Sequence, residues 1–228
     1  MPRQTILVDA DDTLWENNIF FEQTISRFLD CLSHLTYAPE YCRHILNETE
    51  RRNIEQHGYG VRSFRRSLED TYLKLAGGMA RKEIVQEIDK MAEELDAMPP
   101  RILEGVPETL SYLSERHRLI LLSKGEAAAQ AAKVERSGLA TYFDAVEIVP
   151  EKNLATYERV IEQFKIVKSN GWMVGNSPRS DINPALHAGL NAVFVPHHAT
   201  WVLEHEELES GAGKLILLTS FRELRAHF

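Results

Sequence analysis

The sequence has few cysteines and no long run of apolar residues. Only two of its 228 residues are cysteines, Cys31 and Cys42, and neither lies in a CxxC pair or beside candidate histidine ligands. This argues against a disulfide framework and against a zinc site of the usual spacing. Free thiols favour a reducing, cytoplasmic location. The first apolar stretch, residues 5–8, is too short for a signal peptide or a membrane span, so we expect a cytoplasmic protein without a membrane partner.

A cluster of basic residues is also missing. The formal net charge is −8, and the basic residues from His44 to Arg66 are interleaved with Glu48, Glu50 and Glu55, which is typical of a solvated helix face. We therefore expect no nucleic-acid partner. Hydrophobic residues make up 43% and charged residues 26% of the chain, as in an ordinary globular protein. The length fits one large domain or two modest ones.

The most informative stretch lies near the start of the chain. Thr5–Val8 reads TILV, a β-branched apolar run typical of a buried strand, and it leads directly into Asp9, Asp11 and Asp12. Three acids at the end of a buried strand repel one another and resist burial, so a bound cation or a functional role must offset their cost. Because Asp9 and Asp11 are two residues apart, we expect both on the same side of an extended chain.

A purely structural interpretation of these acids remains open. Asp11, Asp12 or Thr13 could cap a helix that begins near Leu14. A helix cap would explain one of these acids, but it would not explain why three acids follow the same strand.

The segment from residue 16 to residue 100 has helical periodicity and no strand pattern. Apolar residues recur at three-to-four residue spacing, and Pro99-Pro100 blocks further helix. We predict helices at 16–35, 39–56, 63–75 and 81–95. Residues 16–100 are thus predicted to form a small all-helical cap domain.

From residue 101 onward, predicted strands alternate with helices. The strands are expected at 119–122, 145–149, 171–174, 191–195 and 215–218, and the helices at 107–115, 127–137, 154–164 and 179–188. Such alternation implies right-handed crossovers and a parallel sheet with helices on both faces. We predict an α/β protein with a three-layer, Rossmann-like core formed by residues 1–15 and 101–228.

Polar residues follow the ends of several predicted strands. In addition to the leading acids, they are Ser123, Lys124, Lys152, Asn176 and Asp181. The carboxyl ends of parallel strands meet at one edge of the sheet, where ligands bind. Side chains of this kind at one edge are typical of an active site for phosphate.

These motifs, in this order, resemble the haloacid dehalogenase superfamily, in the branch with a helical cap inserted after the first strand. Asp9-Ala10-Asp11-Asp12-Thr13 fits the DxDxT motif, Ser123 fits the second motif and Lys152 the third. Residues 175–181, GNSPRSD, resemble the acidic fourth motif. The sequence departs from the family at Asn176, where an acid is common.

The resemblance implies a Mg2+-dependent phosphatase acting on a small phosphorylated metabolite. Asp9 would be the nucleophile that forms an aspartyl phosphate, and Asp11 the general acid and base. Ser123 and Lys152 would bind the phosphoryl group, and Lys152 would also neutralise Asp9. Lys124 is either a further phosphate ligand or an exposed lysine at a helix start.

The expected magnesium ligands are Asp9, Asp11 through its main-chain carbonyl, Asn176 and Asp181. Asparagine can ligate through its carbonyl oxygen but adds no charge, so Asn176 and Asp181 remain alternative direct ligands. His197-His198 invites a separate metal interpretation, but no third ligand has suitable spacing, which favours a loop.

Three other functions share these residues. A 2-haloacid dehalogenase uses the same nucleophile, although it does not need an acid at position 11. A phosphomutase would return the phosphoryl group to its substrate. A non-catalytic relic of the fold is suggested only by Asn176. The particular substrate and the oligomeric state are left open by the sequence.

Overall fold

The computed structural model describes residues 3–228 and contains a six-stranded sheet in the order β5-β4-β1-β6-β7-β8. Every adjacent pair in this sheet is parallel. The strands are β1 (Thr5–Val8), β4 (Arg118–Lys124), β5 (Ala145–Val149), β6 (Gly171–Gly175), β7 (Asn191–Phe194) and β8 (Leu215–Leu217). All six predicted strands are present, and the predicted parallel sheet is confirmed.

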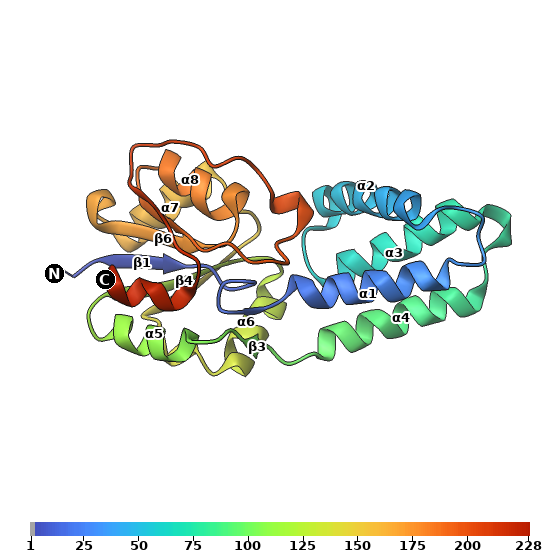
Figure 1. Cartoon of the computed structure of the whole chain (residues 1–228), viewed down its shortest axis with the longest axis horizontal. Helices are drawn as coiled ribbons and strands as arrows, with labels where there is room; N and C mark the ends of the chain where they lie inside the picture. Colours follow the sequence, from blue (N-terminus) through green and yellow to red (C-terminus); the bar gives the residue numbers. More distant parts are fainter. Residues whose placement is uncertain (1–2) are drawn as a thin grey trace. The chain divides into compact units, whose positions relative to one another are not determined.

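Helices cover both faces of this sheet, as Figure 1 shows. The helices are α5 (Val106–Ser114), α6 (Ala127–Ser137), α7 (Leu154–Phe164) and α8 (Asn183–His187). Alternate residues of β1 point to opposite faces: Ile6 packs in the cluster that includes α5, whereas Leu7 packs in the cluster that includes α7. The core is therefore the three-layer, Rossmann-like arrangement expected from the sequence.

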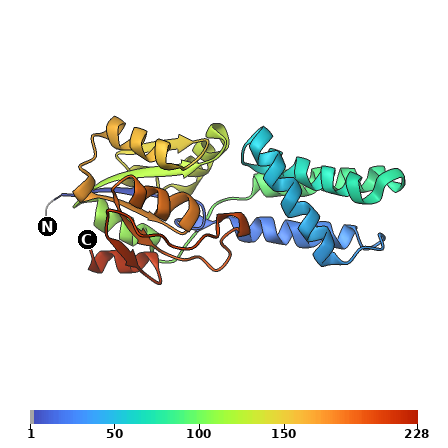
Figure 2. The same ribbon diagram turned by 90° about the horizontal axis from the view of Figure 1, so that it is seen from above.

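A second compact unit comprises Ile19–Met98, and the first consists of the chain up to Asn18 together with Pro99–Phe228. The second unit is helical: its helices are α1 (Asn18–Cys31), α2 (Pro39–His57), α3 (Val61–Ala76) and α4 (Lys82–Ala97) (Figure 2). They enclose their own apolar cluster, in which Phe28, Leu46 and Leu68 are completely buried. Both cysteines lie here as free thiols, Cys42 buried and Cys31 half-buried.

Some local structure differs from the prediction. The first predicted helix ends at Cys31 rather than at residue 35, and the predicted helix 179–188 consists of a wide turn followed by the short α8. Two unexpected two-residue strands, β2 (Trp15–Glu16) and β3 (Arg101–Ile102), pair antiparallel. Short helical turns occur at Gly77–Met79, Ala140–Tyr142, Lys168–Asn170, Val202–Glu204 and Phe221–Ala226. No helix within residues 3–228 is long and apolar enough to cross a bilayer.

Candidate active site

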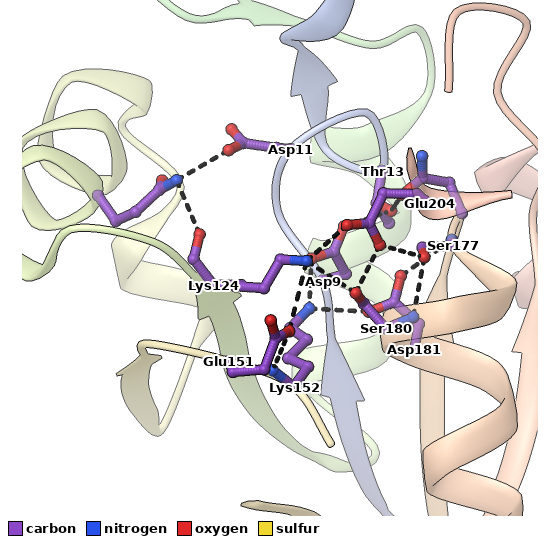
Figure 3. A network of polar contacts seen from close by, with 12 residues as sticks. Asp9, Asp11, Thr13, Lys124, Glu151, Lys152, Ser177, Ser180, Asp181 and Glu204 are labelled. Carbon is purple, nitrogen blue, oxygen red and sulfur yellow. Dashed lines mark hydrogen bonds and ion pairs between the residues drawn. The ribbon is translucent and has the colours of Figure 1, made fainter. Parts of the chain in front are cut away.

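The ends of four neighbouring strands bring most of the predicted site residues together. In register, Val8 lies beside both Leu121 of β4 and Val174 of β6, so the residues after these positions emerge at one edge. Asp9 follows β1 and its main-chain N–H donates to Val174 O at 2.9 Å. Figure 3 shows Asp9, Lys124, Lys152 and Asp181 directed toward one another.

Lys152 lies between two carboxylates. Its Nζ is 2.5 Å from Asp9 Oδ1 and 2.8 Å from Asp181 Oδ1, and its side chain is only 1% exposed. Burial alone would lower the pKa of Lys152, but Asp181 and Asp9 raise it above its ordinary value. Burial and the charge of Asp9 raise the pKa of Asp181 to about 7, with Lys152 opposing them. The single positive charge of Lys152 is thus shared by the carboxylates of Asp9 and Asp181, so this cluster contains more acids than basic residues.

Asp181 is positioned by a wide, π-type turn. In this turn, Pro178–Ile182, the Ile182 N–H bonds Ser177 O at 3.1 Å, and the Ser177 N–H donates to Asp181 Oδ2 at 3.0 Å. The glycine before the turn makes room for the carboxylate, because a Cβ at Gly175 would lie 2.2 Å from Asp181 Oδ2. Such turns interrupt helices often at functional sites.

Thr13 links Asp9 to Asn176. Its Oγ1 lies 2.9 Å from Asp9 Oδ2 and 3.3 Å from Asn176 Oδ1. A hydroxyl has one proton, so Thr13 can donate to only one of these oxygens at a time. On its other side, Asn176 donates from Nδ2 to Thr200 Oγ1 at 3.1 Å. The amide oxygen of Asn176 therefore lies toward the Thr13 hydroxyl, and its NH2 group lies toward Thr200.

These groups fit a magnesium ion. Asp9 Oδ2 and Asn176 Oδ1 are buried oxygen acceptors that share one hydroxyl proton, and oxygen donors are the ligands that Mg2+ prefers. The excess of acids over lysine around Asp9 adds to the electrostatic attraction for a cation. By contrast, both carboxylate oxygens of Asp181 already accept hydrogen bonds, one from Lys152 and one from the Ser177 N–H. This suits a residue that orients the metal ligands without contacting the metal.

Lys124 is held by an acid that the sequence analysis did not identify. Lys124 Nζ lies 2.5 Å from Glu204 Oε1 and 2.8 Å from Ser180 Oγ. The other oxygen of Glu204 accepts from Ser177 Oγ at 2.6 Å and from Ser180 Oγ at 2.5 Å. Burial would raise the pKa of Glu204, but Lys124 and the two serines hold it below its ordinary value. Lys124 is therefore a largely buried member of the site and not an exposed lysine.

Asp11 does not share the side of Asp9, contrary to our expectation. Its carboxylate accepts from Trp15 Nε1 at 2.7 Å, from Gln130 Nε2 at 2.8 Å and from Lys133 Nζ at 3.0 Å, and Figure 3 shows it directed away from Asp9. The chain bends after Ala10, so residues 9 and 11 are not in one extended segment: both Thr13 N and Leu14 N bond Ala10 O. Burial favours neutral Asp11, but Lys133, Gln130 and Trp15 outweigh it and lower its pKa.

Asp12 is the acid to which the helix-capping interpretation applies. It has a left-handed backbone with φ of 61°, and its Oδ1 accepts from the main-chain N–H groups of Asn17 and Asn18 at the start of α1. Asp12, Glu16 and His197 also lie close enough together to be considered as metal ligands. Here His197 Nε2 is 3.1 Å from Glu16 Oε2, but burial lowers the pKa of His197 and so disfavours a charged imidazole beside that carboxylate.

Ser123 is buried at the end of β4, where it pairs in register with Ile148. Thr200, Glu204, Gln130 and Lys133 are the contacts that sequence reasoning missed. None of them follows a strand end or belongs to a recognisable spacing, so the sequence carried no signal for them.

Comparison with known proteins gives one family and several relatives. The family described as haloacid dehalogenase-like hydrolase matches residues 4–189. The Escherichia coli (strain K12) pyrimidine 5'-nucleotidase YjjG is 27% identical over 143 residues, which are 60% of this chain and 59% of that protein. The human N-acylneuraminate-9-phosphatase is 26% identical over 54% of this chain and 52% of its own length. The chain therefore spans little more than half the length of these two relatives.

Two further similarities extend over nearly the whole chain. A glyceraldehyde 3-phosphate phosphatase of Methanothermobacter thermautotrophicus is 26% identical, covering 97% of this chain and 98% of its own. The crystal structure of a haloacid dehalogenase-like family hydrolase from Xanthomonas campestris superposes with a TM-score of 0.86 at 27% identity. That match covers 99% of this chain and 90% of the other.

Proposed function

The chain belongs to the haloacid dehalogenase-like hydrolases, and we propose that it is a Mg2+-dependent phosphatase of a small phosphomonoester. The observation that carries the proposal is the buried group around Asp9, in which Lys152 contacts one carboxylate oxygen and Thr13 the other. Fixing both oxygens orients the carboxylate for attack, and the adjacent cation compensates charge that develops during phosphoryl transfer. The matches to phosphatases and a nucleotidase support the same reaction class.

In the proposed reaction Asp9 attacks phosphorus and the bond to the alcohol oxygen breaks. An aspartyl phosphate forms, and Asp11 gives its proton to the departing alcohol. Water then attacks the same phosphorus, Asp11 takes a proton from it, and phosphate and free Asp9 are released. For these steps Asp11 has to leave Lys133 and Gln130 and take up a proton from solvent water, since these partners keep it ionised and away from Asp9.

The remaining residues hold the transferring group. Ser123 would donate its hydroxyl proton to a phosphoryl oxygen, and Lys152 and Lys124 would offset negative charge. Asp9, Asn176 and the main-chain carbonyl of Asp11 would hold Mg2+, supported by Asp181. When bound, Mg2+ supplies electrostatic stabilisation and orientation of the phosphoryl oxygens.

Replacing the nucleophile tests this proposal. We expect Asp9→Asn to lower the rate of p-nitrophenyl phosphate hydrolysis by on the order of 10^3-fold or more, because an amide oxygen is a poor nucleophile. The far-UV circular dichroism spectrum should be unchanged. Asp96→Asn makes the same chemical change at an exposed residue of α4 and should keep full activity. An Asp9→Asn enzyme as active as the parent would refute covalent catalysis by Asp9.

A further inference from the structure

Asn176 differs from a carboxylate in one respect that matters for a cation. Either oxygen of an aspartate can ligate, whereas an asparagine presents an oxygen in one orientation and an NH2 group in the other. With the NH2 group toward Asp9, the amide would donate hydrogen bonds to the carboxylate and exclude a cation. A ligand role for Asn176 therefore requires something that fixes the amide.

Thr200 has the contacts to do this. Its Oγ1 donates to His197 O at 2.9 Å, which uses the only hydroxyl proton. The same oxygen lies 3.1 Å from Asn176 Nδ2 and can act there only as an acceptor. An acceptor at this position favours the NH2 group and disfavours the amide oxygen, so Asn176 Oδ1 is directed toward Thr13, whose hydroxyl also contacts Asp9.

The loop that carries Thr200 is itself anchored. Ala199 O accepts from Asn18 Nδ2 at 2.7 Å, and the Ala199 N–H donates to His197 Nδ1 at 3.3 Å. The His197 carbonyl is consequently held in place to receive the Thr200 proton. The direction of the hydroxyl, and with it the orientation of the Asn176 amide, follows from contacts made after β7.

We propose that Thr200 is a positioning residue that orients the Asn176 amide so that its oxygen, and not its NH2 group, faces the cation site. This inference rests on the proposed function, because it presupposes that Asn176 contributes a ligand. It predicts that the hydroxyl of Thr200 matters when residue 176 is asparagine, and loses its importance when residue 176 is aspartate. Aspartate presents an oxygen in either orientation.

A double-mutant cycle tests this dependence, with Mg2+ alone titrated into the full-length protein and heat measured by calorimetry. We expect Thr200→Val to weaken Mg2+ binding about 10-fold, as loss of a residue that supports a metal ligand commonly does. Thr200→Ser keeps the hydroxyl and should bind within about 2-fold of the parent. In the Asn176→Asp background, adding Thr200→Val should change Mg2+ affinity by less than about 2-fold.

Two results would overturn the inference. Mg2+ binding by Thr200→Val at the parent affinity would show that the hydroxyl does not orient the amide. Equal weakening in the parent and in the Asn176→Asp background would show that Thr200 supports the loop and not the amide. Thr200→Ala completes the same cycle if Thr200→Val does not fold, as judged by circular dichroism.

The parent protein separates this inference from the proposed function. If the parent binds no Mg2+ and hydrolyses no aryl phosphate, the proposed function fails and the inference fails with it. If the parent does both and only the Thr200 cycle gives no coupling, the inference alone is wrong.

Discussion

At the scale of single residues, the site is dominated by one buried lysine. Lys152 contacts Asp9 and Asp181, and the side chains of Lys152 and Asp181 are each 1% exposed. Removing one partner of a buried ion pair lowers the free energy of unfolding by more than the intact pair contributes to it. The remaining charge stays buried without an opposite charge beside it. Lys152 therefore affects both stability and the proposed chemistry.

Lys152→Met tests this conclusion. We expect its free energy of unfolding to fall by about 3–5 kcal/mol, because two carboxylates are left without their cation. Denaturant unfolding measures this change, and p-nitrophenyl phosphate hydrolysis should be lost in the same variant. Lys168→Met, at an exposed position in the same unit, should change stability by no more than about 0.5 kcal/mol. A Lys152→Met protein as stable as the parent would contradict the buried arrangement.

At the scale of elements, helix α2 carries an acid that the proposed reaction does not use. Glu50 is 6% exposed, and its Oε2 has no hydrogen-bond partner within residues 3–228. Burial raises its pKa from 4.5 to about 7, with Arg43 opposing this and Glu22 adding to it. Between these two pH values the folded protein binds a proton that the unfolded chain has already lost. The free energy of unfolding therefore decreases as pH rises through this window and is constant above it.

Glu50→Gln should remove this pH dependence. A neutral amide resembles protonated Glu50, so we expect similar stability at pH 5. At pH 8 the variant should be more stable than the parent by up to about 3 kcal/mol. Urea unfolding at both pH values gives the comparison. Glu55→Gln, at an exposed position of the same helix, should leave the pH profile unchanged. If Glu50→Gln changed the free energy of unfolding equally at both pH values, a raised pKa of Glu50 would be excluded.

The regular elements were predictable because their signals are local. The TILV run, the apolar strand at 119–122 and the helix-ending Gly138 each specify structure through a few neighbouring residues. The wide turn at Pro178–Ile182 was predicted as ordinary helix, since a single extra residue in a turn leaves the apolar periodicity nearly unchanged. The two-residue strands β2 and β3 were missed because their pairing joins residues far apart in sequence.

At the scale of the whole molecule, the fold is shared with proteins that are named for a different reaction. Structures of L-2-haloacid dehalogenase from Xanthobacter autotrophicus share the fold with TM-scores of 0.64, at 17% and 18% identity. At that identity they inform the fold alone. The phosphatase and the dehalogenase differ in their need for a cation, which gives a test on the intact protein.

Removing divalent cations should abolish phosphatase activity. We expect EDTA to suppress p-nitrophenyl phosphate hydrolysis by at least about 100-fold, because Mg2+ neutralises charge at the phosphoryl group. Excess Mg2+ added to the same sample should restore the rate, which controls for damage by the chelator. Chloride release from a 2-haloacid that persists in EDTA would instead identify a dehalogenase.

The sequence alone determined the alternation of strands and helices, and with it the edge where Asp9, Ser123, Lys152 and Asn176 emerge. It did so because periodicity and strand order are encoded by neighbours along the chain. Only the tertiary structure decided that Asp11 turns toward Lys133 and that Thr200 faces the Asn176 amide. The orientation of Asp11 depends on a partner 122 residues away in the sequence, and that of Asn176 on a partner 24 residues away. Contacts between such distant side chains form only when the sheet is assembled.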